Sequence, residues 1–355
     1  MTRWQDATSD SQGGVDLALR HVAAPATISD VGREVFRREL AVSVPPPDDP
    51  ESPPPRSRTT ATTYDEWIAA VQDGVAEVQP YLDRALAASD VTVTEGEVAG
   101  VPVFHVTPPG AGHDGSRRLL DFHGGGYLFN PGRSGLVVAV WAAHHTGFPV
   151  TTVDYRMAPE HRFPAAVDDC FAVYRGLLRD TDARRLGLIG LSAGGALVAT
   201  TLLRAMADGV ALPGAAVLLS PWSDLTAASD SLRTLEDLDP SLPSADGDLD
   251  ACVDWYVGEH PRADPLASPV FGRYSSDLPP ALLVTGTRDL LLSDTVRLHR
   301  RMREDGSERT CSSTRACGTR SSMTTSPSPA PPGARSAPSS TGSLPGHDPL
   351  TVLPS

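Results

Sequence analysis

The chain has 355 residues, of which 40% are hydrophobic, and a formal net charge of -14. This length allows one domain with a large buried core and a cap. The acidic excess argues against nucleic acid or an anionic membrane surface as a partner. The longest apolar run, residues 135–143, is too short to cross a bilayer.

The first 90 residues predict an N-terminal helical cap segment with a proline-rich linker. The linker, Pro45–Arg58, reads PPPDDPESPPPRSR, and its prolines prevent a continuous helix. Tyr64–Ser89 carries apolar residues at helical spacing, which predicts one or two amphipathic helices. The opening residues, MTRWQDATSDSQGG, contain no apolar stretch typical of a signal peptide, so we expect a cytoplasmic protein.

From Val91 onward, predicted strands and helices alternate. Residues 91–108 alternate in polarity around a turn and predict a hairpin. Further elements follow in chain order: strands at 117–122, 148–156, 184–191, 214–222 and 279–289, and helices at 165–178 and 192–207. The alternation predicts an α/β fold whose central sheet is mostly parallel and covered by helices on both faces. We expect residues 91–307 to form this core, with an acidic insertion near 223–262 that contributes to the cap.

Gly190–Gly194 reads GLSAG and matches the G-x-S-x-G pattern between an apolar strand and a helix. In that context a sharp turn lifts the Ser192 hydroxyl above the sheet, and the glycines avoid clashes. The helix that follows directs its amino-terminal dipole toward developing negative charge. Ser192 is therefore the candidate nucleophile.

His123–Gly126 reads HGGG and follows the predicted strand at 117–122. Consecutive glycines let main-chain N–H groups approach a substrate carbonyl closely, so the amides of Gly124, Gly125 and Ala193 are candidate oxyanion-hole donors. We interpret His123 as a residue that orients this loop.

A carboxylate is expected just past a later strand, where it can hold an imidazole in its productive tautomer. Asp289 and Asp294 both occur in LLVTGTRDLLLSD. We favour Asp289 as the triad acid because it lies nearer the strand end, and Asp294 remains the competitor.

Together these motifs resemble the hormone-sensitive-lipase-like (bacterial family IV) carboxylesterases of the α/β-hydrolase fold. The stretches that carry the resemblance are HGGGY (His123–Tyr127), DYRMAPEHRFPAAVDD (Asp154–Asp169), GLSAGGA (Gly190–Ala196), DPLASP (Asp264–Pro269) and LPPALLVTGTRDLLLSD (Leu278–Asp294). The resemblance implies Ser192 as nucleophile, Asp289 as triad acid, and Gly124, Gly125 and Ala193 as oxyanion donors. It also implies a cap that selects short- or medium-acyl esters.

The family's histidine is expected roughly thirty residues after the acid, in a phrase like G-M-W-H-x-F, and the chain has none there. Near Glu308 the sequence changes to Ser, Thr, Arg, Pro and Gly without periodicity. Such composition predicts a disordered, low-complexity tail over residues 308–355, with loss of the last strand and helix of the core.

A frameshift between about Asp305 and Thr310 explains this change. If the third base of each codon is read with the next two, Ser313–Ser321 permits Asp-Ala-Gly-Met-Trp-His-Ala-Phe, with the histidine codon across Gly318–Thr319. The required codons suit a GC-rich gene, which the use of arginine and no lysine also suggests.

Other histidines are poor substitutes for the base. His347 follows no strand, His299 is expected on an exposed helix face, and His144 and His145 at a helix end. Because geometry must be satisfied before pKa, we do not assign any of them. The loss of a triad member lowers the rate by several orders of magnitude but leaves substrate binding and the oxyanion hole.

The sequence therefore predicts a carboxylic-ester hydrolase that acts on small ester molecules through Ser192 and an acyl-enzyme, with activity impaired in this chain. The alternative is a non-catalytic small-molecule-binding protein on the same scaffold; an amidase or lactonase would share the machinery. Cysteines at 170, 252, 311 and 317 lack metal-site spacing, and no H-E-x-x-H occurs, so we expect no metal and no cofactor. The oligomeric state stays open.

Overall fold

The computed structural model describes residues 63–110, 117–236, 238–239, 242 and 248–304, together with short strands at 8–9, 15–17, 20–22 and 309–314. The chain divides into two units, Met1–Thr325 and Ser326–Ser355, and every described residue belongs to the first.

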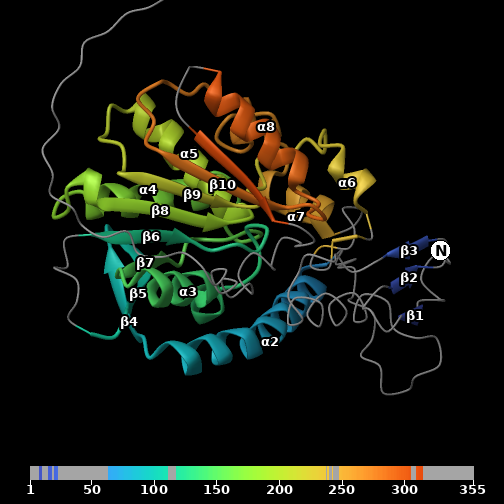
Figure 1. The fold of residues 1–355 in the computed structure, drawn as a ribbon, viewed down its shortest axis with the longest axis horizontal. Coiled ribbons are helices and arrows are strands. Elements are labelled where there is room, and N and C mark those ends of the chain that lie inside the picture. Colours follow the sequence, from blue (N-terminus) through green and yellow to red (C-terminus); the bar gives the residue numbers. More distant parts are fainter. Residues whose placement is uncertain are drawn as a thin grey trace, which may run out of the picture. The chain divides into compact units, whose positions relative to one another are not determined.

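An eight-stranded sheet forms the centre of this unit, in the order β11-β10-β9-β8-β6-β7-β5-β4 (Figure 1). Its strands are β4 (Thr92–Val98), β5 (Val101–Thr107), β6 (Arg118–Phe122), β7 (Val150–Val153), β8 (Leu186–Leu191), β9 (Ala215–Leu219), β10 (Ala281–Gly286) and β11 (Arg309–Thr314). β5 pairs antiparallel with both β4 and β7, and all other neighbours are parallel. The prediction of a mostly parallel sheet is confirmed.

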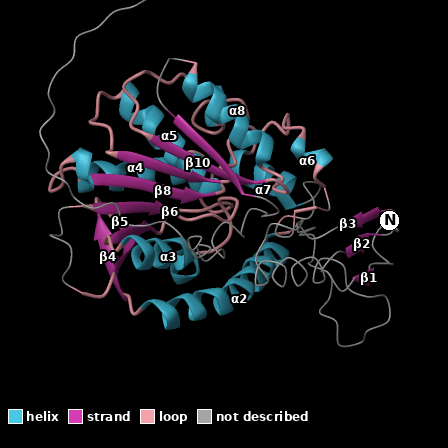
Figure 2. Cartoon of the chain, in the orientation of Figure 1, coloured by secondary structure: helices cyan, strands magenta, loops and turns pink. Residues whose placement is uncertain are grey.

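Helices cover both faces of the sheet (Figure 2). The longer elements are α2 (Tyr64–Ser89), α3 (Val137–Thr146), α4 (Ala165–Leu177), α5 (Ala193–Ala207), α7 (Asp248–Val257) and α8 (Leu292–Arg303). The short ones are α6 (Ser231–Thr234), η1 (Gly132–Leu136), η2 (Ala183–Arg185) and η3 (Pro269–Phe271). One core cluster contains residues of α4, α5, α7 and α8, and a smaller one contains residues of α2 and α3. Across the described residues, no helix combines the length and apolarity that a membrane span requires.

The stretch predicted as one or two amphipathic helices is the single helix α2. Thr63 caps its amino terminus: the Thr63 hydroxyl accepts from the Glu66 N–H, and the Glu66 carboxylate accepts from the Thr63 N–H at 3.1 Å. Val78 and Leu82 of α2 are buried. The predicted hairpin is also present, with Ala99 and Gly100 at positive φ in the turn between β4 and β5.

The N-terminal segment differs from the helical expectation. Its first described elements are three short antiparallel strands, β1 (Thr8–Ser9), β2 (Val15–Leu17) and β3 (Arg20–Val22), so only α2 is helical among the described residues of 1–90. The expected linker, Pro45–Arg58, lies outside the described residues.

The expectation that the last strand is lost is wrong. β11 pairs in parallel with β10, in a register from Ala281↔Arg309 to Gly286↔Thr314. Main-chain groups make this ladder, and RTCSST (Arg309–Thr314) contains no proline or glycine to interrupt it. Leu282 of β10 is 38% exposed. Residues 315–355 lie outside the described part of the chain.

Candidate active site

Ser192 occupies a sharp turn between β8 and α5 and is the N-cap residue of α5. Its backbone has φ 56° and ψ -118°, a conformation that costs a non-glycine residue about 1–3 kcal/mol and persists where the surroundings enforce it. Two hydrogen bonds hold the turn: Ser192 N donates to Leu219 O at 2.8 Å, and Trp222 N donates to Ser192 O at 3.0 Å. Ser192 is partly exposed.

The glycines on either side of Ser192 are required by close backbone approach. A Cβ on Gly194 would lie 1.8 Å from Phe122 O, and one on Gly190 would lie 2.3 Å from Gly194 O. Any side chain at either position would separate β8, α5 and the end of β6. The turn thus has the local geometry that the sequence pattern predicts.

The HGGG loop lies directly against this turn. A Cβ on Gly124 would be 2.8 Å from Leu191 O and 3.5 Å from the Ser192 Cβ. Gly125 has φ 126°, and its Cα approaches Phe129 so closely that a Cβ would be 2.3 Å from Phe129 O. The structure therefore brings the sequence-predicted donor loop to the predicted nucleophile.

The main-chain N–H groups assigned to the oxyanion hole have no backbone acceptor in the described part of the chain. This applies to Gly124, Gly125 and Ala193. Ala193 is the first residue of α5, where N–H groups lack an intrahelical partner and the helix dipole is positive. Such donors can stabilise the oxyanion that forms on a carbonyl oxygen when a hydroxyl attacks the carbonyl carbon.

His123 is buried behind the loop. Its Nδ1–H donates to Gly124 O at 2.9 Å, and its ring stacks on Tyr155 with centroids 4.1 Å apart. Tyr155 also donates its hydroxyl to His123 O at 2.9 Å, and Asn130 donates to Gly124 O at 3.0 Å. Burial lowers the pKa of His123, which favours the neutral ring. These contacts fit the loop-orienting role expected for His123.

Asp289 is fully buried beyond the end of β10. Its carboxylate accepts hydrogen bonds from the Ser220 hydroxyl, the Leu291 N–H at 2.8 Å and the Thr285 hydroxyl at 2.9 Å. Burial raises the pKa of Asp289, and these hydrogen bonds oppose that rise. The donors therefore favour the charged form at a position where burial disfavours it.

The strand register places Asp289 and Ser192 at the same end of the sheet, beyond the carboxyl ends of their strands. Leu191 is paired with Leu219, and Leu219 with Val284, so the ends of β8, β9 and β10 are adjacent. Two strand spacings of about 4.8 Å separate β8 from β10, which gives about 10 Å between the two loops. An imidazole ring placed between a hydroxyl and a carboxylate fits this separation.

The competing carboxylate, Asp294, lies in the first turn of α8 and makes different contacts. It accepts from the Asp224 N–H at 2.9 Å and from the Ser229 hydroxyl. Burial raises the pKa of Asp294 to about 7. Asp224 in turn pairs with Arg297 at 2.5 Å. Asp294 thus links α8 to the segment after β9, whereas Asp289 lies beside Ser220 at the strand ends.

The described histidines do not supply a base at Ser192. No histidine hydrogen-bonds to the Ser192 hydroxyl in the described ranges. His144 and His145 occupy the last turn of α3, as predicted. His299 is not exposed as expected: it is partly buried on α8, and its Nε2 is buried without a partner among described groups. His347 lies outside the described residues.

Sequence reasoning missed two residues that shape the site. Ser220 follows β9 with φ 42° and contacts Asp289, and Tyr155 follows β7 and contacts His123. Their position just after a strand's carboxyl end was the available signal. The described residues contain no cluster of three or more His, Cys, Asp or Glu side chains suited to a metal ion.

Comparison with known proteins identifies the family. A model of the alpha/beta hydrolase fold family matches residues 119–318, more than half of the chain. The chain therefore belongs to the alpha/beta hydrolase fold family. The match continues ten residues beyond Glu308 and ends at Gly318.

The individual relatives place the chain among the hormone-sensitive-lipase-like esterases. An acetyl-hydrolase of Streptomyces hygroscopicus is 38% identical over 228 residues, which cover 61% of this chain and 74% of that protein. A putative acetyl-hydrolase of Mycobacterium tuberculosis is 33% identical, with 57% and 64% covered. Human hormone-sensitive lipase is 33% identical over 168 residues, 45% of this chain and 15% of that protein. The match thus spans only part of these relatives.

Solved structures agree with this placement. The crystal structure of an esterase, E25, superposes with a TM-score of 0.77 at 30% identity and covers 93% of this chain and 94% of its own. A hormone-sensitive lipase from a metagenome library superposes with a TM-score of 0.69 at 31% identity, with 82% and 90% covered.

Proposed function

We propose that the chain is a carboxylic-ester hydrolase that uses Ser192 as its nucleophile. The observation that carries this proposal is that the HGGG loop lies against the Ser192 turn, where a Cβ on Gly124 would be 3.5 Å from the Ser192 Cβ. Relatives named acetyl-hydrolase and ethyl acetate hydrolase favour short-acyl esters as substrates. We accordingly propose a small ester, of short or medium acyl length, as the substrate.

The proposed reaction has two halves. The Ser192 Oγ attacks the acyl carbon, its proton passes to a base, and the carbonyl oxygen becomes an anion held by the N–H groups of Gly124, Gly125 and Ala193. Collapse of this tetrahedral species breaks the ester C–O bond, releases the alcohol and leaves an acyl group on Ser192. Water then attacks the acyl carbon, releases the acid and restores the hydroxyl.

The base is the missing part of this scheme. Asp289 would orient and stabilise an imidazole placed between it and Ser192. We propose that the gene's original frame encodes this histidine and that the present chain is impaired because it lacks the residue. Binding and oxyanion stabilisation remain, so residual activity is expected at a rate lower by about three orders of magnitude or more.

Imidazole added in solution tests this reading directly. Hydrolysis of p-nitrophenyl acetate and p-nitrophenyl butyrate is measured with and without imidazole, for the chain and for Ser192→Ala. Because imidazole cleaves such esters by itself, the Ser192→Ala rate at the same imidazole concentration is subtracted. The proposal expects a saturable, Ser192-dependent rate that imidazole increases; equal rates for both proteins in all conditions would refute it.

A second candidate is a non-catalytic small-molecule-binding protein. It is favoured by the Ser192 hydroxyl, which has no histidine partner among described residues. Such a protein would bind an ester or a related carbonyl compound without forming an acyl-enzyme. Ligand binding that leaves Ser192 unmodified, with and without imidazole, would favour this candidate over the hydrolase.

A further inference from the structure

The loop that carries the proposed oxyanion donors is in contact with the insertion helix α7 at two successive residues. A Cβ on Gly126 would lie 3.0 Å from the Cys252 Sγ of α7. The next residue, Tyr127, stacks its ring on Tyr256 of α7, with centroids 3.8 Å apart and planes 4° from parallel. Tyr127 is 2% and Tyr256 1% exposed. The contact is therefore part of the buried core.

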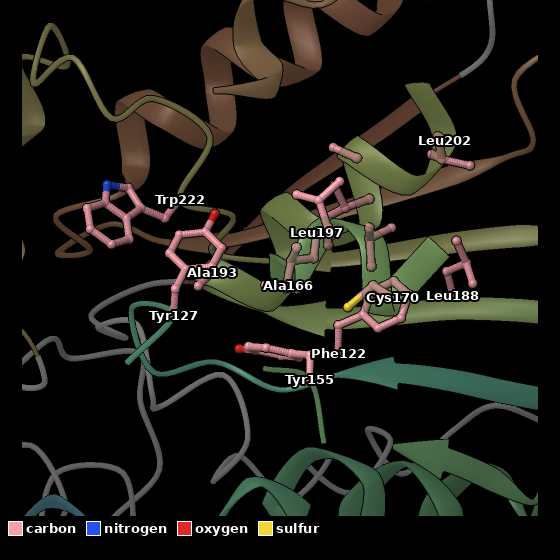
Figure 3. Packing of buried hydrophobic residues seen from close by; sticks show 14 of the residues in the cluster. Phe122, Tyr127, Tyr155, Ala166, Cys170, Leu188, Ala193, Leu197, Leu202 and Trp222 are labelled. Carbon is pink, nitrogen blue, oxygen red and sulfur yellow. The ribbon is translucent and has the colours of Figure 1, made fainter. Parts of the chain in front are cut away.

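Tyr127 adopts a backbone conformation that needs external support. Its φ is 68°, in the left-handed region, which costs a residue with a Cβ roughly 1 kcal/mol. Figure 3 shows the Tyr127 ring facing Trp222, and the two ring centroids are 6.0 Å apart. Tyr127 directly follows the three glycines, so its ring contacts lie at the end of the loop.

A single chain segment ties both stacked tyrosines together. Ala158 N donates to Tyr127 O at 3.1 Å, and Phe163 N donates to Tyr256 O at 2.9 Å. Phe163 also packs edge-on against the Tyr256 ring, with centroids 5.9 Å apart. Residues 158–163 thus hydrogen-bond through the main chain to both the loop and α7. The Tyr127–Tyr256 stack joins the loop to α7 through side chains.

We propose that Tyr256 is a positioning residue, which holds the Gly124–Tyr127 loop in place through its stack on Tyr127. The helix α7 then contributes indirectly to oxyanion stabilisation beside Ser192. This inference deepens the proposed hydrolase function and rests on it for its catalytic consequence. The claim that Tyr256 positions the loop depends only on the packing of Tyr127 against α7.

The test compares three variants by hydrogen–deuterium exchange of the peptide that contains Gly124–Phe129. Tyr256→Leu removes the ring stack but keeps an apolar side chain. Tyr256→Phe keeps the ring and removes only the hydroxyl. Val253→Ala, at another buried position of α7, controls for general loosening of that helix. We expect loop exchange to accelerate about tenfold in Tyr256→Leu, the scale of losing an aromatic pair with its packing. Tyr256→Phe and Val253→Ala should match the parent chain.

A second readout separates this proposal from the proposed function. In the imidazole-supplemented ester assay, Tyr256→Leu should lower kcat about tenfold with KM changed less than twofold, and Tyr256→Phe should restore the parent rate. Equal loop exchange in Tyr256→Leu and Val253→Ala would overturn the positioning role, whatever the activity. Exchange that accelerates in Tyr256→Leu but not in Val253→Ala supports the positioning role. A parent chain that is no more active than Ser192→Ala would refute the hydrolase function and leave the positioning role intact.

Discussion

Ser220 donates its hydroxyl hydrogen bond to Asp289, and both side chains are buried at the ends of adjacent parallel strands. Ser220 is itself held at φ 42°, with its N–H on Val284 O at 2.7 Å. The strand that carries it lies between β8, which leads to Ser192, and β10, which leads to Asp289. The Ser220 hydrogen bond thus opposes the rise in the Asp289 pKa that burial causes.

Removal of this donor should destabilise the protein in a pH-dependent way. Burial already raises the pKa of Asp289, and Ser220→Ala should raise it further. A carboxyl whose folded-state pKa exceeds its unfolded value lowers the free energy of unfolding as pH rises. The loss of unfolding free energy in Ser220→Ala, relative to the parent, should therefore be larger at pH 8 than at pH 5. About 1–3 kcal/mol is expected at pH 7.

Urea unfolding at both pH values measures this deficit. Ser134→Ala is the control, because Ser134 is also buried but donates to a neutral acceptor, Pro131 O. Its deficit should be independent of pH. If Ser220→Ala behaves in the same way as Ser134→Ala, the Ser220 contact does not stabilise the ionised form of Asp289.

A second buried carboxyl should make the whole fold less stable as pH rises from about 4 to 8. Asp121 of β6 is fully buried, accepts one hydrogen bond from the Thr152 hydroxyl at 3.2 Å, and burial raises its pKa to about 8. The folded state keeps this proton while the unfolded chain loses it near pH 4. Asp121 alone should therefore lower the free energy of unfolding by about 1.4 kcal/mol per pH unit between pH 4 and 8.

Asp121→Asn should remove that slope and raise stability at pH 8, as chemical denaturation across the pH range would show. Thr152→Val is the matched variant, because it removes the hydrogen bond but keeps the carboxyl, and it should retain the slope. A parent-like slope in Asp121→Asn would show that Asp121 is ionised in the folded protein at neutral pH.

Close backbone contact makes Gly194 intolerant of any side chain. Gly194→Ala would place a Cβ 1.8 Å from Phe122 O, so we expect a loss of more than about 3 kcal/mol in unfolding free energy or failure to fold. Gly74→Ala, in α2, is the comparison: its Cβ would meet only the Phe129 side chain at 3.1 Å. That change should be neutral or stabilising by up to about 1 kcal/mol. Thermal unfolding of soluble Gly194→Ala near the parent midpoint would contradict the tight turn.

Restoring the reading frame near Glu308 should restore catalysis. The restored chain is expected to carry a histidine at the position across Gly318–Thr319, a few residues beyond the end of β11. Turnover of p-nitrophenyl butyrate should increase about a thousandfold or more, the scale of regaining a triad member. The restored chain with Ser192→Ala is the control and should stay at background. A gene in which no reading frame encodes this histidine would refute the frameshift.

The sequence allowed most of the sheet to be predicted, because its inner strands are short apolar runs bounded by turns and helices. β8 with α5 and the hairpin β4–β5 follow directly from apolar periodicity. β11 could not be predicted in this way, since Arg309–Thr314 carries no apolar pattern and pairs through main-chain groups with β10. Likewise, nothing in residues 1–44 indicated three short strands.

The candidate site was predictable where motifs fix backbone geometry. The approach of Gly124 to Ser192 follows from glycine spacing and strand order. Ser220 and Tyr155 stand just after strand ends, which is a sequence signal, but the contacts of Ser220, Tyr155 and Tyr256 could not be predicted. These contacts join segments that are far apart in the chain.

Peptide mass spectrometry after treatment with a fluorophosphonate tests most directly whether Ser192 is a nucleophile in an anion-stabilising site. We predict one phosphonyl group, on Ser192, that forms faster with imidazole present and fastest in the frame-restored chain. A restored chain that leaves Ser192 unmodified, or that carries the label on another serine, would contradict the account.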